Sequence, residues 1–257
     1  MRTGQPAVSA GIACRWILLL AAVALPGPAA VAGPDEDSRQ VQTASSPAWL
    51  AAVGRLQVPG SKFSDGRRRH HREDCSATLV ARRPGDRSDT IVTAWHCLEF
   101  YHDLSKPIRF LLPGETMTGA GREAYRVADG GGMRADWAIL RLHSAVPRRL
   151  AQAVLVDSDP ADPQRPISMA GYSRDDGIGA GGERLTFDLD CSISRQQSHS
   201  SESDCWAYKG ASGGAVVQLS TEGVPVLRGV ISQGNGAGFS SYVPTGHIRS
   251  AVRQHNR

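Results

Sequence analysis

Ser212 lies in the segment KGASGGAVV, residues 209–217, between small residues and ahead of a β-branched run. Glycine, alanine and serine are common wherever a chain bends sharply, so composition alone favours a simple turn here. A serine hydroxyl on such a turn can also act as a nucleophile, but it is a weak one unless an adjacent base takes its proton. The role of Ser212 therefore depends on whether the chain supplies partners for it.

Two other segments contain candidate partners for Ser212. His96 lies near the end of IVTAWHC, residues 91–97, and Asp136 precedes the apolar run of RADWAILRL, residues 134–142. Each is ambiguous alone, because a histidine at a strand end is usually structural or exposed and an aspartate that begins a strand is usually a turn residue. Together the three side chains are the base, the orienting carboxylate and the nucleophile that acyl transfer requires.

The motifs T-A-x-H-C, D-x-A-I-L and G-x-S-G-G surround His96, Asp136 and Ser212 in that chain order. This order resembles the chymotrypsin and trypsin family, and most of all the compact, secreted trypsin-like serine peptidases of bacteria, because the separations between the three residues are short. The likeness extends over roughly residues 48–253. It implies an all-β fold of two six-stranded antiparallel β-barrels with a C-terminal helix, and MAGY at 169–172 looks like the strand that opens the second barrel.

The resemblance also implies a secreted serine endopeptidase that hydrolyses peptide bonds through an acyl-enzyme intermediate. In that chemistry His96 accepts the proton of Ser212 and returns it to the leaving amine, while Asp136 orients and stabilises His96. Gly210 allows a tight turn that aims its own N–H and that of Ser212 at the developing oxyanion. We therefore expect Ser212 to be a nucleophile rather than only a turn residue.

Substrate contacts are implied by the same resemblance, through the segment before Ser212 and the strand RGVISQG, residues 228–234. The expected substrate-binding residues are Trp206, Lys209, Ser232, Gln233 and Gly234. Trp206 falls where the family selects the P1 side chain, but Tyr208 replaces the cysteine that usually fixes this segment. We expect a modest apolar P1 preference, and Lys209 at the pocket mouth leaves an acidic preference open.

Ala211 precedes the nucleophile at a position where the activatable animal enzymes carry an aspartate that pairs with a newly cut N-terminus. No such ion pair can form here, so we expect packing and hydrogen bonds to hold the oxyanion loop. Activity should then not require a defined mature N-terminus. On this reasoning, chains that begin at Gly33 or at Ala44 are expected to be equally active.

Short segments rich in β-branched and aliphatic residues alternate with turn signals along most of the chain, which predicts an all-β protein. They group into two units, residues 48–145 and 167–257, joined by a proline-rich connection at 146–166. Periodicity alone does not distinguish paired barrels from a sandwich, so the barrels rest on the resemblance.

One helix is expected at the C-terminal end, beginning at Thr245, which can cap it. Its apolar residues fall on one face at helical spacing, namely Ile248, Ala251 and Val252.

The first 32 residues predict a secretory signal peptide. Arg2 and Arg15 precede the apolar stretch at 16–32, which ends in Ala-Val-Ala, the small-x-small form that signal peptidase cuts. A membrane anchor is the alternative, but two prolines interrupt the stretch well short of the roughly 20 apolar residues of a spanning helix. We expect a secreted or periplasmic protein, free of the membrane after cleavage, in which residues 33–47 are flexible.

Four cysteines remain once Cys14 is removed with the signal peptide, and four thiols allow three pairings. Proximity in the sequence favours disulfides from Cys75 to Cys97 and from Cys191 to Cys205, and the resemblance places the first beside the histidine loop. A zinc site is the alternative, but no C-x-x-C or H-x-x-x-H spacing supports it. We expect no metal and no cofactor.

The formal net charge is +4, and loss of residues 1–32 removes two arginines and no acid, which leaves +2. Such a balance is too small to indicate a nucleic-acid partner. The basic run RRRHHR at 67–72 is followed by Glu73 and Asp74 and lacks interleaved aromatic residues for base stacking, so a solvated loop is expected. Attraction to an anionic surface or polymer, or cleavage there by another protease, is the alternative. The expected state is a monomer whose partner is a protein or peptide substrate.

Two other functional classes stay open. A catalytically weak trypsin-like homologue would use the barrels and the basic run for binding, although its triad would be expected to be broken and here it is whole. An esterase or lipase of the α/β-hydrolase class needs G-x-S-x-G and the chain order serine, aspartate, histidine, and this chain has the histidine first.

Overall fold

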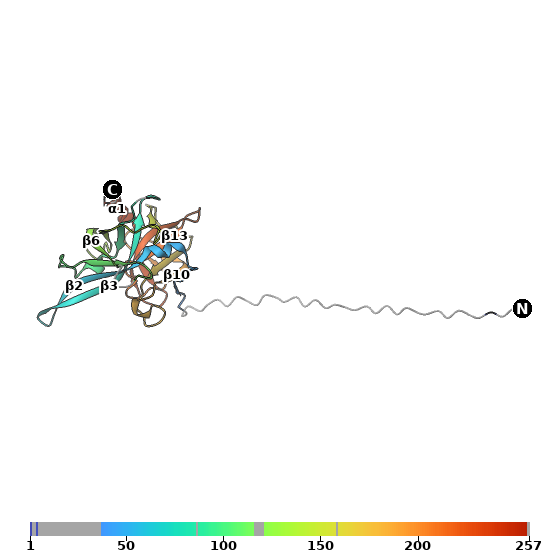
Figure 1. The fold of residues 1–257 in the computed structure, drawn as a ribbon, viewed down its shortest axis with the longest axis horizontal. Helices are drawn as coiled ribbons and strands as arrows, with labels where there is room; N and C mark the ends of the chain where they lie inside the picture. The colour runs from blue at the N-terminus through green and yellow to red at the C-terminus, as the bar shows by residue number, and fades with distance from the viewer. Residues whose placement is uncertain (2–3, 5–36, 86, 116–120, 158, 256–257) are drawn as a thin grey trace. The chain divides into compact units, whose positions relative to one another are not determined.

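The computed structural model describes residues 1, 4, 37–85, 87–115, 121–157 and 159–255 (Figure 1). The described residues from 37 onward belong to one compact unit, Pro34–Arg257, and the fold below is that of this unit. The expected signal peptide, residues 1–32, falls outside the described residues apart from Met1 and Gly4. Among the described residues, no helix is long and apolar enough to cross a membrane.

A closed antiparallel barrel of six strands forms the first half of the unit. Its strands are β2 (Val53–Ser64), β3 (Arg67–Ala81), β4 (Thr90–Thr93), β5 (Ile108–Leu111), β6 (Arg122–Asp129) and β7 (Ala138–Leu142). The hydrogen-bonded order is β3-β2-β5-β6-β7-β4, and β4 pairs again with β3 to close the ring. Inward side chains such as Leu79, Ile91 and Phe110 are fully buried, and this burial of apolar area holds the ring together. The first predicted barrel is thus confirmed.

A seven-stranded antiparallel sheet forms the second half. Its strands are β9 (Ile167–Gly171), β10 (Thr186–Cys191), β11 (Ile193–Arg195), β12 (Ser201–Ser203), β13 (Ala215–Leu219), β14 (Pro225–Gly234) and β15 (Ser240–Pro244). The described pairings run β10-β9-β13-β14-β15-β12-β11 and do not join β11 or β12 to β10. The second of the two expected closed barrels is therefore not found.

The outer edge of β10 is paired over two residues with a strand from the N-terminal segment. The strand β1 (Gln40–Val41) pairs with Phe187 and Thr186 of β10. A disulfide from Cys191 to Cys205 links the end of β10 to the segment after β12.

Strand β8 (Val154–Val156) lies within the stretch 146–166 that was expected to be only a connection. It pairs in parallel with both β3 and β14, so the barrel and the second sheet share one continuous ladder. The buried apolar cluster likewise runs from barrel residues such as Leu140 into second-sheet residues such as Leu227.

Residues 37–47 differ from the expectation of a flexible segment over 33–47. Besides the pairing of β1, the Gln42 N–H donates to the Leu185 carbonyl at 2.9 Å. The Arg39 side chain is only 1 % exposed, and Ser38 donates to the Asp188 carboxylate at 2.9 Å. These polar side chains find partners in the second half of the unit, Asp188 and Asp175. A short 3₁₀ helix, η1 (Ala48–Ala52), then leads into β2.

The basic run 67–72 is part of strand β3 rather than a loop. The β2 and β3 strands pair without interruption from Val53–Thr78 to Ser64–Arg67, and their outer part extends beyond the barrel (Figure 1). Asp65 and Gly66 both have positive φ, as the tight two-residue turn of a hairpin requires. Asp-Gly is the sequence signal for such a turn. This turn allows the polar residues on either side of it to pair as a two-stranded hairpin.

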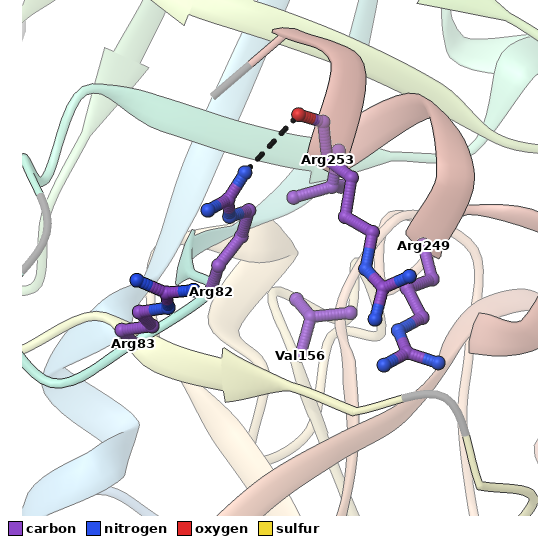
Figure 2. Close-up of a pocket in the computed structure, with 6 residues that line it drawn as sticks. Arg82, Arg83, Val156, Arg249 and Arg253 are labelled. Atoms are coloured by element: carbon purple, nitrogen blue, oxygen red, sulfur yellow. Dashed lines mark hydrogen bonds between the residues drawn. The ribbon is translucent and has the colours of Figure 1, made fainter. Parts of the chain in front are cut away.

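The expected C-terminal helix is present as α1 (Arg249–His255), preceded by a 3₁₀ turn, η4 (Thr245–His247). Ile248 and Val252 are buried as predicted. Thr245 does not cap the helix: it lies inside the 3₁₀ turn, and its hydroxyl is buried without a partner. The last turn of α1 is instead held by Arg82, which donates to the Arg253 carbonyl at 3.2 Å (Figure 2).

Candidate active site

The Ser212 turn joins β12 to β13 and contains two glycines with positive φ. Gly210 has φ +97° and Gly213 has φ +84°. A Cβ on Gly213 would lie 2.1 Å from both the Ser76 carbonyl oxygen and Thr93 Oγ1, so no larger residue fits there. The small residues around Ser212 therefore let this turn pass against the barrel wall.

Ser76 of β3 connects the barrel to that turn. Its N–H donates to the Ser212 carbonyl at 2.8 Å, and its hydroxyl donates to the Gly210 carbonyl at 2.8 Å. The same hydroxyl accepts a hydrogen bond from the Tyr172 N–H at 2.8 Å. Ser76 was missed by sequence reasoning; its one signal is a polar residue at the start of the buried run SATLVA, because a buried hydroxyl needs partners.

His96 and Asp136 are brought together by the barrel register. Thr93, the last residue of β4, pairs with Ala138, the first residue of β7. Residues just after β4 and just before β7 therefore lie at one edge, where the 3₁₀ turn η2 (Trp95–Leu98) carries His96. His96 Nδ1 lies 2.9 Å from one Asp136 carboxylate oxygen and 3.1 Å from the other, and the His96 N–H donates to Asp136 at 2.9 Å.

The Asp136 carboxylate is 1 % exposed and also accepts a hydrogen bond from the Ser232 hydroxyl at 2.5 Å. Burial alone would raise its pKa, but the hydrogen bonds and charge of His96, together with the bond from Ser232, hold the pKa below its ordinary value. The carboxylate is therefore ionised around neutral pH and available to fix the imidazole.

Ser212 Oγ lies in the same pocket as His96, and both side chains line it. The hydroxyl donates to the Ser232 carbonyl at 3.3 Å. Between these two described side chains, Ser212 and His96, the structure has no hydrogen bond. The three predicted residues thus gather at one site, with the imidazole already paired to Asp136 and the serine hydroxyl turned toward β14.

The pocket has a volume of about 470 Å³ and includes most of the expected substrate-binding residues. Its lining residues are His96, Met133, Tyr208, Lys209, Ser212, Ile231, Ser232, Gln233 and Gly234. Trp206 does not belong to this lining; its backbone N–H donates to the Asp188 carboxylate of β10 at 2.8 Å. Sequence reasoning missed Met133, Tyr208 and Ile231 as lining residues, although the last two are neighbours of predicted ones.

The N–H groups of Gly210 and Ser212 do not donate to any described residue, which leaves both available to a ligand. The preceding carbonyl, that of Lys209, accepts the Arg174 N–H at 2.7 Å. In a trans peptide the C=O and the N–H point in opposite directions, so this bond turns the Gly210 N–H away from Arg174.

Both predicted disulfides are present, Cys75–Cys97 and Cys191–Cys205. The first ties β3 to η2 directly beside His96 and limits how far the histidine turn can move. All four sulfur atoms are consumed, so neither cluster of nearby His, Cys and Asp side chains found among the described residues retains a free thiolate for a metal.

A second cavity of about 470 Å³ lies under α1 and shares no lining residue with the Ser212 pocket. Figure 2 shows the arginine side chains around it: its lining residues are Arg82, Arg83, Val156, Arg249, Val252 and Arg253.

A closed six-stranded barrel beside a second antiparallel sheet, with serine, histidine and aspartate side chains at their junction, is typical of serine peptidases of the chymotrypsin type. A model of the trypsin-like peptidase domain matches residues 75–225. The chain therefore belongs to the trypsin-like peptidase family, whose members are serine endopeptidase hydrolases.

Three solved structures with the same fold are distant from this chain in sequence. The thermostable serine protease AL20 from an extremophilic microorganism has a TM-score of 0.62 and 18% identity, with 82% of this chain and 99% of that chain covered. The protease Anisep from Arthrobacter nicotinovorans has a TM-score of 0.61 and 17% identity, with 85% of this chain and 99% of that chain covered. The active form of the Rv3671c protease from M. tuberculosis has a TM-score of 0.56 and 14% identity, with 80% of this chain and 81% of that chain covered. No curated protein matches the chain.

The lowered pKa of Asp136 predicts how stability depends on pH. A carboxylate whose pKa is lower in the folded state than in the unfolded state stabilises the fold above its unfolded value, near pH 4, and this contribution is lost as the pH falls through the folded value. Asp136→Asn removes the titrating group. The free energy of unfolding of the wild type, measured in urea, should therefore fall more steeply below pH 4 than that of Asp136→Asn. Ser212→Ala keeps the carboxylate, so its free energy of unfolding should depend on pH as that of the wild type does. If the free energy of unfolding falls equally steeply with pH in all three proteins, the pKa of Asp136 is not lowered by folding.

Proposed function

We propose that this protein is a secreted serine endopeptidase in which Ser212, His96 and Asp136 form the catalytic triad. The observation that carries the proposal is the double contact of the buried Asp136 carboxylate with His96 Nδ1, which leaves Nε2 as the ring nitrogen open to the pocket that Ser212 also lines. Family membership adds the reaction class.

The proposed reaction begins when the Ser212 hydroxyl turns from the Ser232 carbonyl toward His96 Nε2 and attacks the substrate carbonyl carbon. His96 takes the hydroxyl proton, and the imidazolium that forms is stabilised by Asp136. His96 then donates that proton to the leaving amine, which departs and leaves an ester on Ser212 Oγ. Water repeats the cycle: His96 takes its proton, the hydroxide attacks the ester, and the proton returns to Ser212.

The oxyanion formed in each half-reaction is proposed to bind the N–H groups of Gly210 and Ser212. Both lack a described partner, and the Arg174 N–H bond to the Lys209 carbonyl turns the Gly210 N–H away from Arg174. Donors that are already oriented need no rearrangement as charge develops, and one such donor typically contributes about 3 kcal/mol to the barrier reduction.

Ser212→Ala tests the assignment directly. Loss of the nucleophile should reduce peptide hydrolysis by about 10⁴- to 10⁶-fold in kcat and abolish labelling by a fluorophosphonate, while the circular dichroism spectrum stays unchanged. Asp136→Asn should cost about 10⁴-fold because the histidine tautomer is no longer fixed. Turnover by Ser212→Ala at the parental rate would refute the triad; a folded wild type that is neither labelled nor active would favour the alternative, a catalytically weak homologue that acts as a binding protein.

Secretion or periplasmic localisation is proposed together with this activity. Residues 1–32 would be the signal peptide, the barrel unit would span 48–145, and the second unit with the helix would span 167–257. Two disulfides are consistent with folding in an oxidising compartment. The mature protein would be a monomer acting on protein or peptide substrates.

N-terminal sequencing of the exported protein checks the processing site. The Ala-Val-Ala signal predicts a chain that starts at Gly33 or shortly after it. An exported protein that keeps Met1 would contradict cleavage and favour a membrane anchor.

The pocket also predicts which P1 side chains are disfavoured. Its described lining includes one lysine, Lys209, and no arginine, aspartate or glutamate, and the other lining residues include Met133, Tyr208 and Ile231. A basic P1 side chain would meet a like charge without a carboxylate, whereas a small apolar side chain meets apolar surface.

Matched p-nitroanilide peptides with alanine, valine or leucine at P1 should therefore exceed those with arginine or lysine by at least about tenfold in kcat/KM. Lys209→Glu should raise turnover of the arginine peptide and leave the alanine peptide within about twofold. A wild-type preference for arginine or lysine would contradict this description of the pocket.

A further inference from the structure

Arg39 is a buried cation that sequence reasoning placed in a flexible segment. Its side chain is 1 % exposed and has two carboxylate partners. One guanidinium edge, Nε and Nη2, donates to Asp37 at 2.9 and 2.7 Å, and Nη1 donates to Asp175 Oδ1 at 2.8 Å. A buried guanidinium is costly unless such partners surround it, so this group has a built site.

Asp175 is the partner that links Arg39 to the candidate active site, through the neighbouring residue Arg174. Its other carboxylate oxygen accepts the Gly179 N–H at 3.1 Å, and its carbonyl accepts the Gly181 N–H at 2.9 Å. These bonds fold residues 173–182 into a compact loop. The residue directly before Asp175 is Arg174, whose N–H holds the Lys209 carbonyl at 2.7 Å.

The guanidinium also contacts the Ser212 turn on its other side. Arg39 Cζ lies 4.1 Å from the centre of the Tyr208 ring, the distance of a cation–π contact. The Tyr208 carbonyl accepts the Ala211 N–H at 3.0 Å, which closes the turn ahead of Ser212. The ring itself is packed against Gly236, where an added Cβ would lie 2.3 Å from it.

We infer that Arg39 is a positioning residue for the oxyanion turn, holding Lys209 and Gly210 from two sides through Asp175 and through Tyr208. The inference rests on the proposed function, because it gives the Gly210 N–H its catalytic meaning. The position of Arg39 decides the direction of that N–H: Asp175 fixes the loop that carries the Arg174 N–H, and the Arg174 N–H fixes the Lys209–Gly210 peptide. Arg39 touches neither substrate nor reacting atoms and acts only through these neighbours.

This arrangement explains how the oxyanion turn is held although Ala211 stands in place of an aspartate. With no aspartate beside the nucleophile, the turn has no acceptor for an N-terminal amine, and a side-chain cation supplied by the N-terminal segment supports the turn instead. The amine itself is still expected to be dispensable. The expectation that a chain starting at Ala44 is as active as one starting at Gly33 is revised, because only the longer chain contains Arg39.

The primary test compares Arg39→Met with Arg122→Met in the full-length mature enzyme. Arg122 forms a half-buried pair with Glu115 at 2.8 Å in the first barrel, so its loss is a matched removal of a paired guanidinium away from the turn. Active sites are titrated to completion with a fluorophosphonate, and kcat and KM are measured per titrated site. Arg39→Met should lower kcat about tenfold to a hundredfold and leave KM within twofold. This fall is smaller than the fall in kcat of about a hundredfold to a thousandfold that follows removal of a whole oxyanion donor. Arg122→Met should lower the melting temperature but keep kcat within twofold.

A double-mutant cycle separates positioning from general destabilisation. Asp175→Asn weakens the same link and should lower kcat to a similar extent, and Arg39→Met combined with Asp175→Asn should be no worse than either alone. Arg39→Lys, which retains the charge but not the two-sided fork, should give an intermediate kcat. If Arg39→Met does not fold, Arg39→Lys and Asp175→Asn carry the test.

Four outcomes decide the matter. A tenfold or larger fall in kcat per site in Arg39→Met, absent in Arg122→Met and not additive with Asp175→Asn, supports the inference. An Arg39→Met or Arg39→Lys enzyme with wild-type kcat per site overturns it, as does an equal fall in Arg122→Met. A wild type that is neither labelled nor active removes the proposed function first, and the inference with it.

Discussion

Three hydrogen bonds made by Ser76 define the junction on which the rest of the site depends. This one buried residue of β3 donates to the carbonyls of Ser212 and Gly210 and accepts from the N–H of Tyr172 at the end of β9. The barrel, the second sheet and the nucleophile turn therefore meet at a single side chain and its peptide. In a dry interior each of those groups would be costly if unpaired, so the three bonds specify one position for the turn.

The tightness of this junction explains the sequence around Ser212. The Ser76 carbonyl, which also accepts the Thr93 hydroxyl at 2.7 Å, would lie 2.1 Å from a Cβ at position 213. Glycine is required there because two backbones touch and because φ at this position is +84°. Since β3 pairs with β4, the strand that places Ser212 also neighbours the strand that ends at Thr93, three residues before His96. The separation of nucleophile and base is thus set by one strand pairing.

Features whose residues are close together in the sequence could be predicted, whereas features that join residues far apart in the sequence could not. Residues His96, Asp136 and Ser212 were found because each carries a local motif, and both disulfides were found because their cysteines are close in sequence. Arg39 was missed although one partner, Asp37, is two residues away, because the other, Asp175, is 136 residues away and no local pattern distinguishes a buried arginine from a solvated one before the fold is known. The pairing of β1 with β10 was missed for the same reason, because the two strands lie about as far apart in the sequence.

Support by a guanidinium has a physical consequence that support by an amine would lack. An α-amino group has an ordinary pKa near 8 and loses its charge within the range where proteins work, whereas a guanidinium keeps its charge throughout that range. For Asp175, burial alone would raise the pKa, but the bond from Arg39 and the Gly179 N–H hold the pKa below its ordinary value, so the carboxylate also stays ionised down to acid pH. The link between the N-terminal segment and the oxyanion turn therefore consists of two groups whose charges do not change near neutrality.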